Sequence, residues 1–313
     1  MNEKIKYSII IPHHNIPQLL DRSLKSIPDI PEIQVVVVDD NSDLNKIDAI
    51  KKVCARSNVD LILTKEGKGA GYARNVGISK AKGRWLLFCD SDDFFADGFL
   101  NKLDEYYDSN YDLIFFNFQT IDSDTLEELP KRVFIHDVAM KKKNIEYLRF
   151  GFPPPWSKLV KKTVVDNNKI KFEEVPSSND VHFSGMIGFW SDKAKIDDYV
   201  LYIAAVRKNS LTKLESVTSL GVRINVARRY NDFLKSINKN KYGCRTNILH
   251  YIWNMRKVDK AAFKNNLKIY FATESLRDIW IDLLRSLAGL CTLLFNPETK
   301  KCKNVYMEKI DHK

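Results

Sequence analysis

The stretch Trp85–Phe95 constrains the fold most, because an apolar run ends there abruptly in carboxylates. The run Trp85–Cys89 has no polar residue, which is typical of a strand buried on both faces. Asp90, Asp92 and Asp93 follow it at once. Ligands of open α/β sheets bind beyond the carboxyl ends of the strands, and carboxylates this close repel one another unless a cation lies between them. The stretch therefore predicts a site for Mg²⁺ or Mn²⁺, with an ordinary acidic turn as the alternative.

The residues before this stretch alternate between strand and helix patterns. Tyr7–Ile11 and Ile33–Val38 are runs rich in β-branched residues, and Pro17–Ile27 between them carries apolar residues at helical spacing. A third strand pattern, Val59–Thr64, precedes the glycine-rich loop Gly67–Gly71. Strands that alternate with helices indicate βαβ units. We therefore predict an α/β fold with a Rossmann-like, mostly parallel sheet flanked by helices.

The pattern changes after Leu214. Later segments with helical periodicity mix Lys and Arg with Trp, Leu and Phe. We predict an α/β catalytic domain over residues 1–214 and an all-helical, basic extension over residues 215–313. Two interpretations of the extension stay open. A basic amphipathic helix can lie on an anionic membrane, whereas a helical cap would pack on the catalytic domain or on a second subunit.

Charge and cysteine usage narrow the class of protein. The net charge of +10 suits nucleic acid, an anionic membrane surface or a phosphorylated substrate, and no nucleic-acid-binding motif accompanies it. The five cysteines show no CxxC spacing, which favours reduced thiols in a cytoplasmic protein without structural zinc. The amino-terminal residues lack a signal-peptide pattern, and no apolar stretch of about 18 residues predicts a transmembrane helix.

Several motifs now stand in a fixed order along the chain. They are Ser-Ile-Ile-Ile-Pro-His-His-Asn at 8–15, Val-Val-Val-Val-Asp-Asp-Asn-Ser at 35–42, Gly-Ala-Gly-Tyr-Ala-Arg-Asn-Val-Gly-Ile at 69–78 and Trp-Leu-Leu-Phe-Cys-Asp-Ser-Asp-Asp at 85–93. Trp-Ser-Lys-Leu-Val-Lys-Lys at 156–162, Asn-Asp at 179–180 and a strand with a polar end at 201–212 fit the same order. With them the chain resembles family 2 glycosyltransferases with the GT-A fold, of the bacterial surface-polysaccharide type. The resemblance covers residues 7–212 and leaves out the helical extension.

The resemblance implies an enzyme of class EC 2.4, a hexosyl- or N-acetylhexosaminyl-transferase. Such an enzyme would be inverting and dependent on Mn²⁺ or Mg²⁺. It would move a sugar from a nucleotide-sugar, with a UDP-sugar favoured, to a hydroxyl of a glycan or lipid-linked glycan in capsule, O-antigen or related polysaccharide synthesis. Contact with the cytoplasmic face of the inner membrane and homo-oligomer formation are further expectations.

The resemblance also assigns roles to individual residues. Asp92 would hold the metal on the diphosphate, and Asp180 would take the proton of the acceptor hydroxyl as general base. Trp156, which a proline-rich loop presents, would form a wall of the acceptor pocket or plug the core. The residues implied for nucleotide-sugar binding are Pro12, His13, Asn15, Asp39, Asp40, Arg74, Asp90 and Ser91.

Some departures from the family pattern leave alternatives open. The family commonly has Thr-Tyr-Asn at the position of His13-His14-Asn15, so these histidines could equally be surface-loop residues. Asn179 stands where the family often has Glu, and Glu173 and Glu174 are alternative bases. A non-catalytic glycan-binding or scaffold protein on the same fold is the main functional alternative. A sugar nucleotidyltransferase is disfavoured, because no glycine-rich loop with Arg and Lys follows the first strand.

Overall fold

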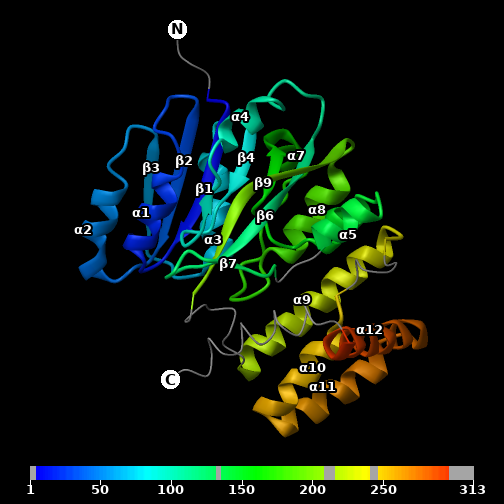
Figure 1. Cartoon of the computed structure of the whole chain (residues 1–313). Helices are drawn as coiled ribbons and strands as arrows, with labels where there is room; N and C mark the ends of the chain where they lie inside the picture. Colours follow the sequence, from blue (N-terminus) through cyan, green and yellow to red (C-terminus); the bar gives the residue numbers. More distant parts are fainter. Residues whose placement is uncertain (1–4, 132–134, 208–215, 240–245, 296–313) are drawn as a thin grey trace. The chain divides into compact units, whose positions relative to one another are not determined.

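The computed structural model describes residues 5–131, 135–207, 216–239 and 246–295, with side chains as far as residue 287. These residues divide into two compact units (Figure 1). The first contains residues 5–128 and 135–205, and the second contains 129–131 and the described residues from 206 onward. The predicted boundary between residues 214 and 215 lies outside the described residues, as do residues 208–212 of the last motif.

The first unit is built on one mixed sheet with the strand order β3-β2-β1-β4-β8-β6-β9-β5, and β7 pairs with β6 (Figure 1). The strands are β1 Tyr7–His13, β2 Ile33–Asp40, β3 Val59–Thr64, β4 Trp85–Phe88, β5 Phe94–Phe95, β6 Leu113–Asp122, β7 Glu128–Leu129, β8 Lys158–Lys161 and β9 Ala194–Val206. Strands β3, β2, β1 and β4 are parallel. The β4–β8, β8–β6 and β5–β9 pairs are antiparallel. The predicted α/β fold is confirmed. The sheet is parallel over β1, β2, β3 and β4.

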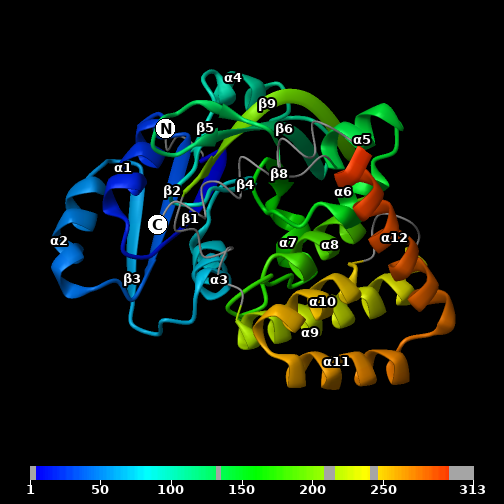
Figure 2. The same ribbon diagram turned by 60° about the horizontal axis from the view of Figure 1, so that its bottom comes forward.

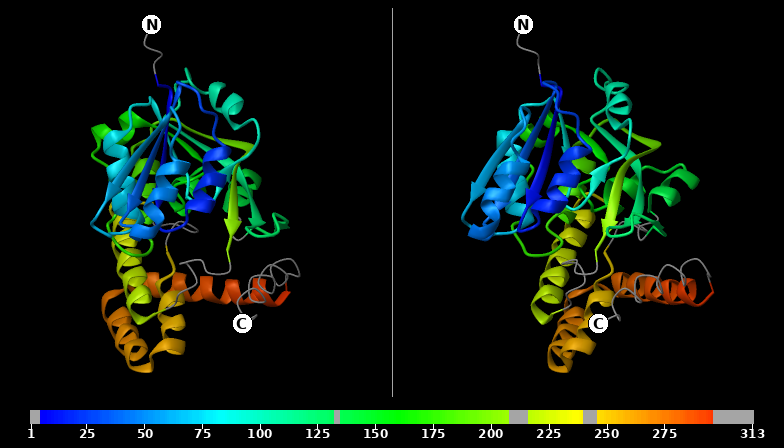
Figure 3. Two further views of the ribbon diagram at one scale, coloured as in Figure 1. Left: turned by 90° about the vertical axis from the view of Figure 1, so that its left-hand side faces the viewer. Right: turned by 60° about the vertical axis from the view of Figure 1, so that its left-hand side comes forward.

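The helices of the first unit flank this sheet. They are α1 Pro17–Lys25, α2 Leu44–Val53, α3 Ala70–Lys80, α4 Phe99–Asp104, α5 Ile135–Lys141, α6 Glu146–Gly151, α7 Lys162–Asn167 and α8 Val181–Trp190. Helices α1, α2 and α3 connect successive parallel strands, as βαβ units require. Figure 3 shows α1 and α2 beside the parallel strands from two sides.

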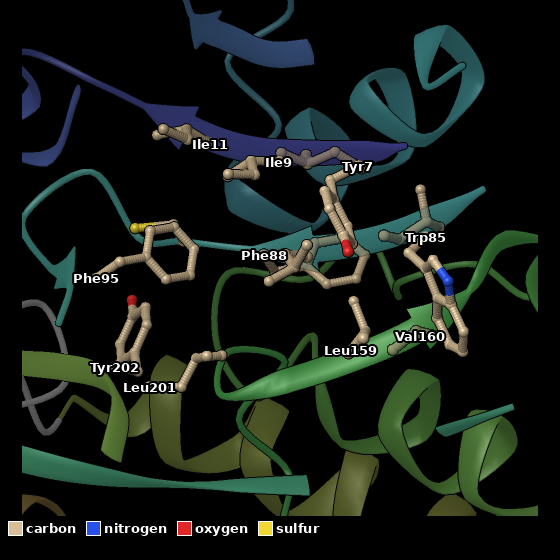
Figure 4. Packing of buried hydrophobic residues seen from close by; sticks show 14 of the residues in the cluster. Tyr7, Ile9, Ile11, Trp85, Phe88, Phe95, Leu159, Val160, Leu201 and Tyr202 are labelled. Carbon is tan, nitrogen blue, oxygen red and sulfur yellow. The ribbon is translucent and has the colours of Figure 1, made fainter. Parts of the chain in front are cut away.

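Continuous apolar runs bury both faces of the parallel strands. On β2, Val35 and Val37 belong to the main core, which also contains Leu20 of α1 and Ile50 of α2. Val36 and Val38 alternate with them and pack with Ala73 of α3 in a separate cluster. The main core continues through Tyr7, Trp85, Phe88 and Tyr202 (Figure 4). With both faces covered, only the carboxyl ends of the strands are left to present polar groups.

The second unit is helical among its described residues, apart from the end of β7 and of β9. Its helices are α9 Val217–Ser236, α10 Ile248–Val258, α11 Lys260–Thr273 and α12 Leu276–Phe295 (Figure 2). Helix α10 contacts α9, α11 and α12, and the apolar core contains Leu220, Ile252, Met255 and Tyr270. In the part of the chain that the structure describes, no helix has the length and apolar character needed to cross a membrane.

Candidate active site

The ends of β1 and β2 are joined by a buried hydrogen bond between two side chains. The register places His13 opposite Asp39, and His13 Nδ1 lies 2.7 Å from Asp39 Oδ2. His13 Nε2 accepts the backbone N–H of Ile16, which leaves Nδ1 to donate its proton to the carboxylate. Burial raises the pKa of Asp39, but the hydrogen bonds from His13 and Ser42 outweigh it, so the pKa is lowered overall. His13 is therefore a buried strand residue and not a surface-loop residue.

Asn15 ties the loop after β1 to the loop after β2. Its backbone N–H donates to Ser42 Oγ at 2.7 Å, and its side-chain oxygen accepts the backbone N–H of Asp43 at 2.8 Å. Asn15 has a positive φ of 61°, which Asn tolerates better than most residues. Pro12 is buried within β1 directly before these contacts. The loops after β1 and β2 are thus held together as one rim.

Asp40 connects this rim to the glycine-rich loop. Its carboxylate accepts hydrogen bonds from the Thr64 hydroxyl, at 3.1 Å, and from the backbone N–H of Gly69. Gly69 has a φ of 87°, in the left-handed region where a side chain would be strained. Helix α3 begins at the next residue, so the carboxylate of Asp40 fixes where this helix begins.

Arg74 on α3 bridges two loops that are far apart in the sequence. Its guanidinium donates to Asp90 Oδ1 at 2.5 Å and to Asn179 Oδ1 at 2.9 Å. Only 6% of Arg74 is exposed. A Cβ added to Gly71, one turn earlier on α3, would lie 2.2 Å from the carbonyl oxygen of Glu173. The loop before α8 therefore packs directly against the first turn of α3, which brings Asn179 within reach of Arg74.

Asp180 follows Asn179 and is the first residue before α8. It is half-buried. Burial raises the pKa of its carboxyl group, although the positive charges of Arg74 and Lys158 act in the opposite direction. A carboxylate with a raised pKa is a stronger base than an exposed one. Asp180 thus follows the partner of Arg74 in the chain and has a raised pKa, and its role as general base stays a prediction.

The four residues of the acidic loop after β4 differ in burial and in hydrogen-bond partners. They are Asp90, Ser91, Asp92 and Asp93. Ser91 is buried, and Asp90 is partly exposed. The carboxylate of Asp93 accepts hydrogen bonds from the Tyr202 hydroxyl and from the backbone N–H of Ala205, both at 2.7 Å. The Tyr202 hydroxyl in turn accepts the backbone N–H of Asp90 at 3.0 Å. Asp93 therefore anchors the acidic loop to β9.

Trp156 lies against this anchor. Its ring stacks on Tyr202 with centroids 5.0 Å apart and an angle of 3° between the planes. Phe118 and Phe152 contact it edge-on, at centroid distances of 4.9 Å and 5.5 Å. Trp156 is half-buried, so it packs against the aromatic cluster and also keeps surface beside the acidic loop. The two interpretations of Trp156, wall and core plug, are thus compatible.

The acidic loop is where the sequence predicts a metal ion. Asp92 is half-buried, and its backbone carbonyl accepts a hydrogen bond from Arg22 at 2.7 Å. Among the described residues, no group of three or more His, Cys, Asp or Glu side chains could hold a metal ion. Mg²⁺ in nucleotide sites usually binds one or two carboxylates and completes its shell with phosphate oxygens and water. Asp92 and Asp90 fit that arrangement.

Lys158 on β8 is a residue to which the sequence assigned no role. Its side chain is buried, and Nζ donates to the Phe152 carbonyl at 2.7 Å and to Ser184 Oγ at 3.0 Å. The Ser184 hydroxyl on α8 donates to the carbonyl of Pro153. Burial lowers the pKa of Lys158 to about 7. Lys158 therefore ties the proline-rich loop to the helix that follows Asp180. The sequence held no clear signal for it, because β8 reads Lys-Leu-Val-Lys and nothing in that order distinguishes Lys158 from Lys161.

A surface hollow between α1 and α2 is separate from these contacts. Residues that line it include Asp21, Lys52 and Arg56, and none of the candidate site residues does. The site is therefore located by convergent polar groups at the strand ends and not by the shape of this hollow.

Residues 8–167 match the family model described as glycosyl transferase family 2, which is just over half of the chain. The chain belongs to this family. The prediction of the family is confirmed, and membership places the chain among glycosyltransferases.

Two curated family 2 relatives illustrate the match. The chain is 23% identical over 216 residues to the uncharacterized glycosyltransferase EpsJ of Bacillus subtilis, and the match covers 66% of this chain and 63% of EpsJ. It is 28% identical over 205 residues to the poly(ribitol-phosphate) beta-N-acetylglucosaminyltransferase TarS of Staphylococcus aureus, covering 61% of this chain and 35% of TarS. The matches thus span less than two thirds of either relative's length.

Solved structures show the same fold. The crystal structure of S. aureus TarS 1-349 in complex with UDP-GlcNAc has a TM-score of 0.60 at 18% identity, over 97% of this chain and 81% of that one. The mannosyltransferase PcManGT of Pyrobaculum calidifontis, in complex with GDP-Man and Mn²⁺, has a TM-score of 0.55 at 19% identity, over 97% and 85%. The GT-A fold with a helical carboxyl-terminal region is thereby confirmed.

Proposed function

We propose that this family 2 glycosyltransferase moves a sugar from a UDP-sugar to a hydroxyl of a glycan, with inversion at the anomeric carbon. The observation that carries the proposal is the bridge from Arg74 to Asp90 and Asn179, with Asp180 beside it. It combines a cation for the departing diphosphate with a base for the incoming hydroxyl. Because TarS, a relative, was crystallised with UDP-GlcNAc, we propose an N-acetylhexosamine as the first sugar to test.

The donor nucleotide is proposed to bind the rim formed by the loops after β1 and β2. Asp40 would accept a hydrogen bond from the base, and uracil offers an N–H for this purpose. Asp39, held by His13 and Ser42, would keep this rim rigid, and Pro12 would line the pocket. A rigid rim binds the base with little loss of conformational entropy.

The diphosphate is proposed to lie between Arg74 and the acidic loop. Asp92, together with Asp90, would hold Mn²⁺ or Mg²⁺, and such an ion neutralises charge that develops on the leaving group. Arg74 neutralises the same charge from the other side without a change in protonation state. Ser91, buried between the two aspartates, would keep the loop against β4.

The acceptor hydroxyl is proposed to approach Asp180 past Trp156. Asp180 would take the proton as the hydroxyl oxygen attacks the anomeric carbon and the bond to the diphosphate breaks. Attack from the side opposite the leaving group inverts the anomeric centre, and no covalent sugar–enzyme intermediate is required. The indole of Trp156 would provide an apolar surface for a sugar ring.

The acceptor, location and assembly state are further parts of the proposal. We propose a glycan or lipid-linked glycan of a capsule, O-antigen or related polysaccharide, modified at the cytoplasmic face of the inner membrane. The net charge of +10 favours contact with an anionic membrane surface. Packing of the helical unit on the catalytic domain or on a second copy of the chain is the alternative for that unit.

Donor binding and turnover test this function. UDP-, GDP- and CDP-sugars would be screened for thermal stabilisation and hydrolysis, with and without Mn²⁺, on the wild type and on Asp92→Ala. We expect stabilisation by one UDP-sugar that requires the metal and is lost in Asp92→Ala. Asp48→Ala is a matched control, because Asp48 is exposed on α2 and belongs to none of the site motifs.

Absence of any nucleotide binding, with and without metal, would overturn the transferase proposal. It would favour the non-catalytic glycan-binding protein, which binding to a glycan array would then detect. Metal-independent binding of a UDP-sugar would retain the donor site and remove the metal from the proposal.

A further inference from the structure

Helix α12 turns its acidic residues inward. Asp278 and Asp282 are almost fully buried within the helical unit. The carboxylate of Asp282 accepts a hydrogen bond from the Tyr270 hydroxyl at 2.9 Å. The carboxylate of Asp278 accepts one from the Ser275 hydroxyl at 2.8 Å and lies 3.0 Å from Lys235 Nζ. Polar contacts with α9 and α11 therefore fix which side of α12 faces its own unit.

The opposite side of α12 is apolar and exposed. Its members share one stripe of the helix at spacings of three or four residues. We define the α12 outer face as Leu276, Trp280, Leu283, Leu284 and Leu287. Leu276 is 80% exposed and Trp280 is 65% exposed. A surface helix of a globular protein normally shows the reverse pattern, with apolar residues inside and charged residues outside.

The exposed charged residues of α10, α11 and the described part of α12 have one sign. Between residues 246 and 287, every acidic residue is buried or half-buried: Asp259, Glu274, Asp278 and Asp282. The exposed charged residues of the same stretch are all basic: Arg256, Lys257, Lys260, Lys264, Lys268 and Arg277. A group of helices that exposes an apolar stripe on one helix and only cations among its exposed charged residues matches a surface that is apolar inside and anionic at its rim.

We propose that the α12 outer face binds an anionic lipid bilayer, with its Leu and Trp side chains in the boundary between headgroups and acyl chains. The exposed Lys and Arg side chains would contact the lipid phosphates. A helix that lies in the interface needs no membrane-spanning length. The inference rests on the proposed membrane-side function, but it is independent of the donor sugar.

Vesicle co-sedimentation with the full chain tests the inference. The vesicles would be phosphatidylcholine alone and phosphatidylcholine mixed with phosphatidylglycerol. We expect binding to the anionic vesicles only, weakened by salt, and reduced at least roughly tenfold in Trp280→Ser/Leu284→Gln. Both side chains are exposed, so the variant should fold, which circular dichroism would check. Leu44→Gln is the matched control, because Leu44 is 91% exposed on α2 of the other unit.

Three outcomes would overturn the inference. In the first, the wild-type chain stays in the supernatant with anionic vesicles. In the second, the double variant sediments with these vesicles as well as the wild type does. In the third, light scattering shows that the wild type is an oligomer and the double variant is a monomer, which would assign the face to a second copy of the chain. Binding of UDP-sugar by the double variant, measured in the same preparation, separates loss of membrane contact from failure of the proposed transferase site.

Discussion

In the α/β unit several buried polar side chains gather at the carboxyl ends of the parallel strands, whereas in the helical unit buried carboxylates hold one helix against its neighbours. His13, Asp39 and Arg74 are buried and still lie beside groups that a ligand can reach. Asp278 and Asp282 are equally buried, but their partners are other side chains of the helical unit. Burial of a charge is thus no evidence of catalysis by itself, and the difference lies in where the partners point.

Replacement of the proposed base should give the largest effect. Asp180→Asn keeps the size of the side chain and removes its basicity, so we expect kcat to fall by roughly 10²- to 10⁴-fold. Because burial raises the pKa of Asp180, wild-type kcat should begin to fall on acidification at a higher pH than an exposed aspartate would give. Steady-state rates across pH, with UDP binding as a control for folding, check both expectations. Unchanged kcat would move the role to Glu173 or Glu174.

Loss of the bridge that Arg74 makes to Asp90 and Asn179 should give the second-largest effect. Arg74→Lys keeps the charge but removes the two-pronged contact with Asp90 and Asn179. Charge-assisted hydrogen bonds contribute about 1.5–3 kcal/mol, so donor affinity should fall by about tenfold to a hundredfold. Calorimetric titration with UDP measures it. Arg84→Lys is the control, because Arg84 directly precedes β4 and pairs with Asp108, away from the carboxyl ends of the strands. If Arg74→Lys bound UDP as tightly as the wild type, the role assigned to Arg74 would be contradicted.

Lys158 gives the α/β unit a pH-dependent stability. Burial lowers its pKa from 10.5 to about 7 in the folded chain, so the unfolded chain binds more protons between these values. The free energy of unfolding should therefore rise with pH between about pH 7 and 10.5, and Lys158 should contribute on the order of 1 kcal/mol per pH unit. Below about pH 7, Lys158 should not make the free energy of unfolding depend on pH. Urea unfolding of wild type and Lys158→Met measures it. The same slope in both proteins would show that Lys158 is not the source.

The smallest expected effect lies in the helical unit. Tyr270→Phe removes the hydrogen bond to Asp282 and should lower the local stability of α12 by about 1 kcal/mol. Hydrogen exchange of residues 276–287 would report it, and UDP binding by the α/β unit should not change. If Tyr270→Phe also weakened donor binding, the contrast between a site-forming unit and a helix-holding unit would fail.

Local patterns were sufficient to predict much of the α/β unit. Buried strands that end in Asp39-Asp40 and Asp90-Ser91-Asp92-Asp93 have a recognisable pattern, because strand ends and polar loops are properties of short segments. The family and the GT-A fold followed from the order of these motifs, and the comparisons confirm both. The role of each site residue stays a prediction, which the experiments above test.

Only the tertiary structure decided which side chains meet and which face of a helix is covered. Nothing near Arg74 in the sequence indicates Asn179 as its partner, and Lys158 has the appearance of an ordinary lysine until β8 places it under the proline-rich loop. Periodicity indicated helices after Leu214, but it could not predict that Asp278 and Asp282 face inward. The two carboxylates face inward because Tyr270 and Lys235 bind them there. Long-range partners of this kind are set by packing and not by neighbours in the sequence.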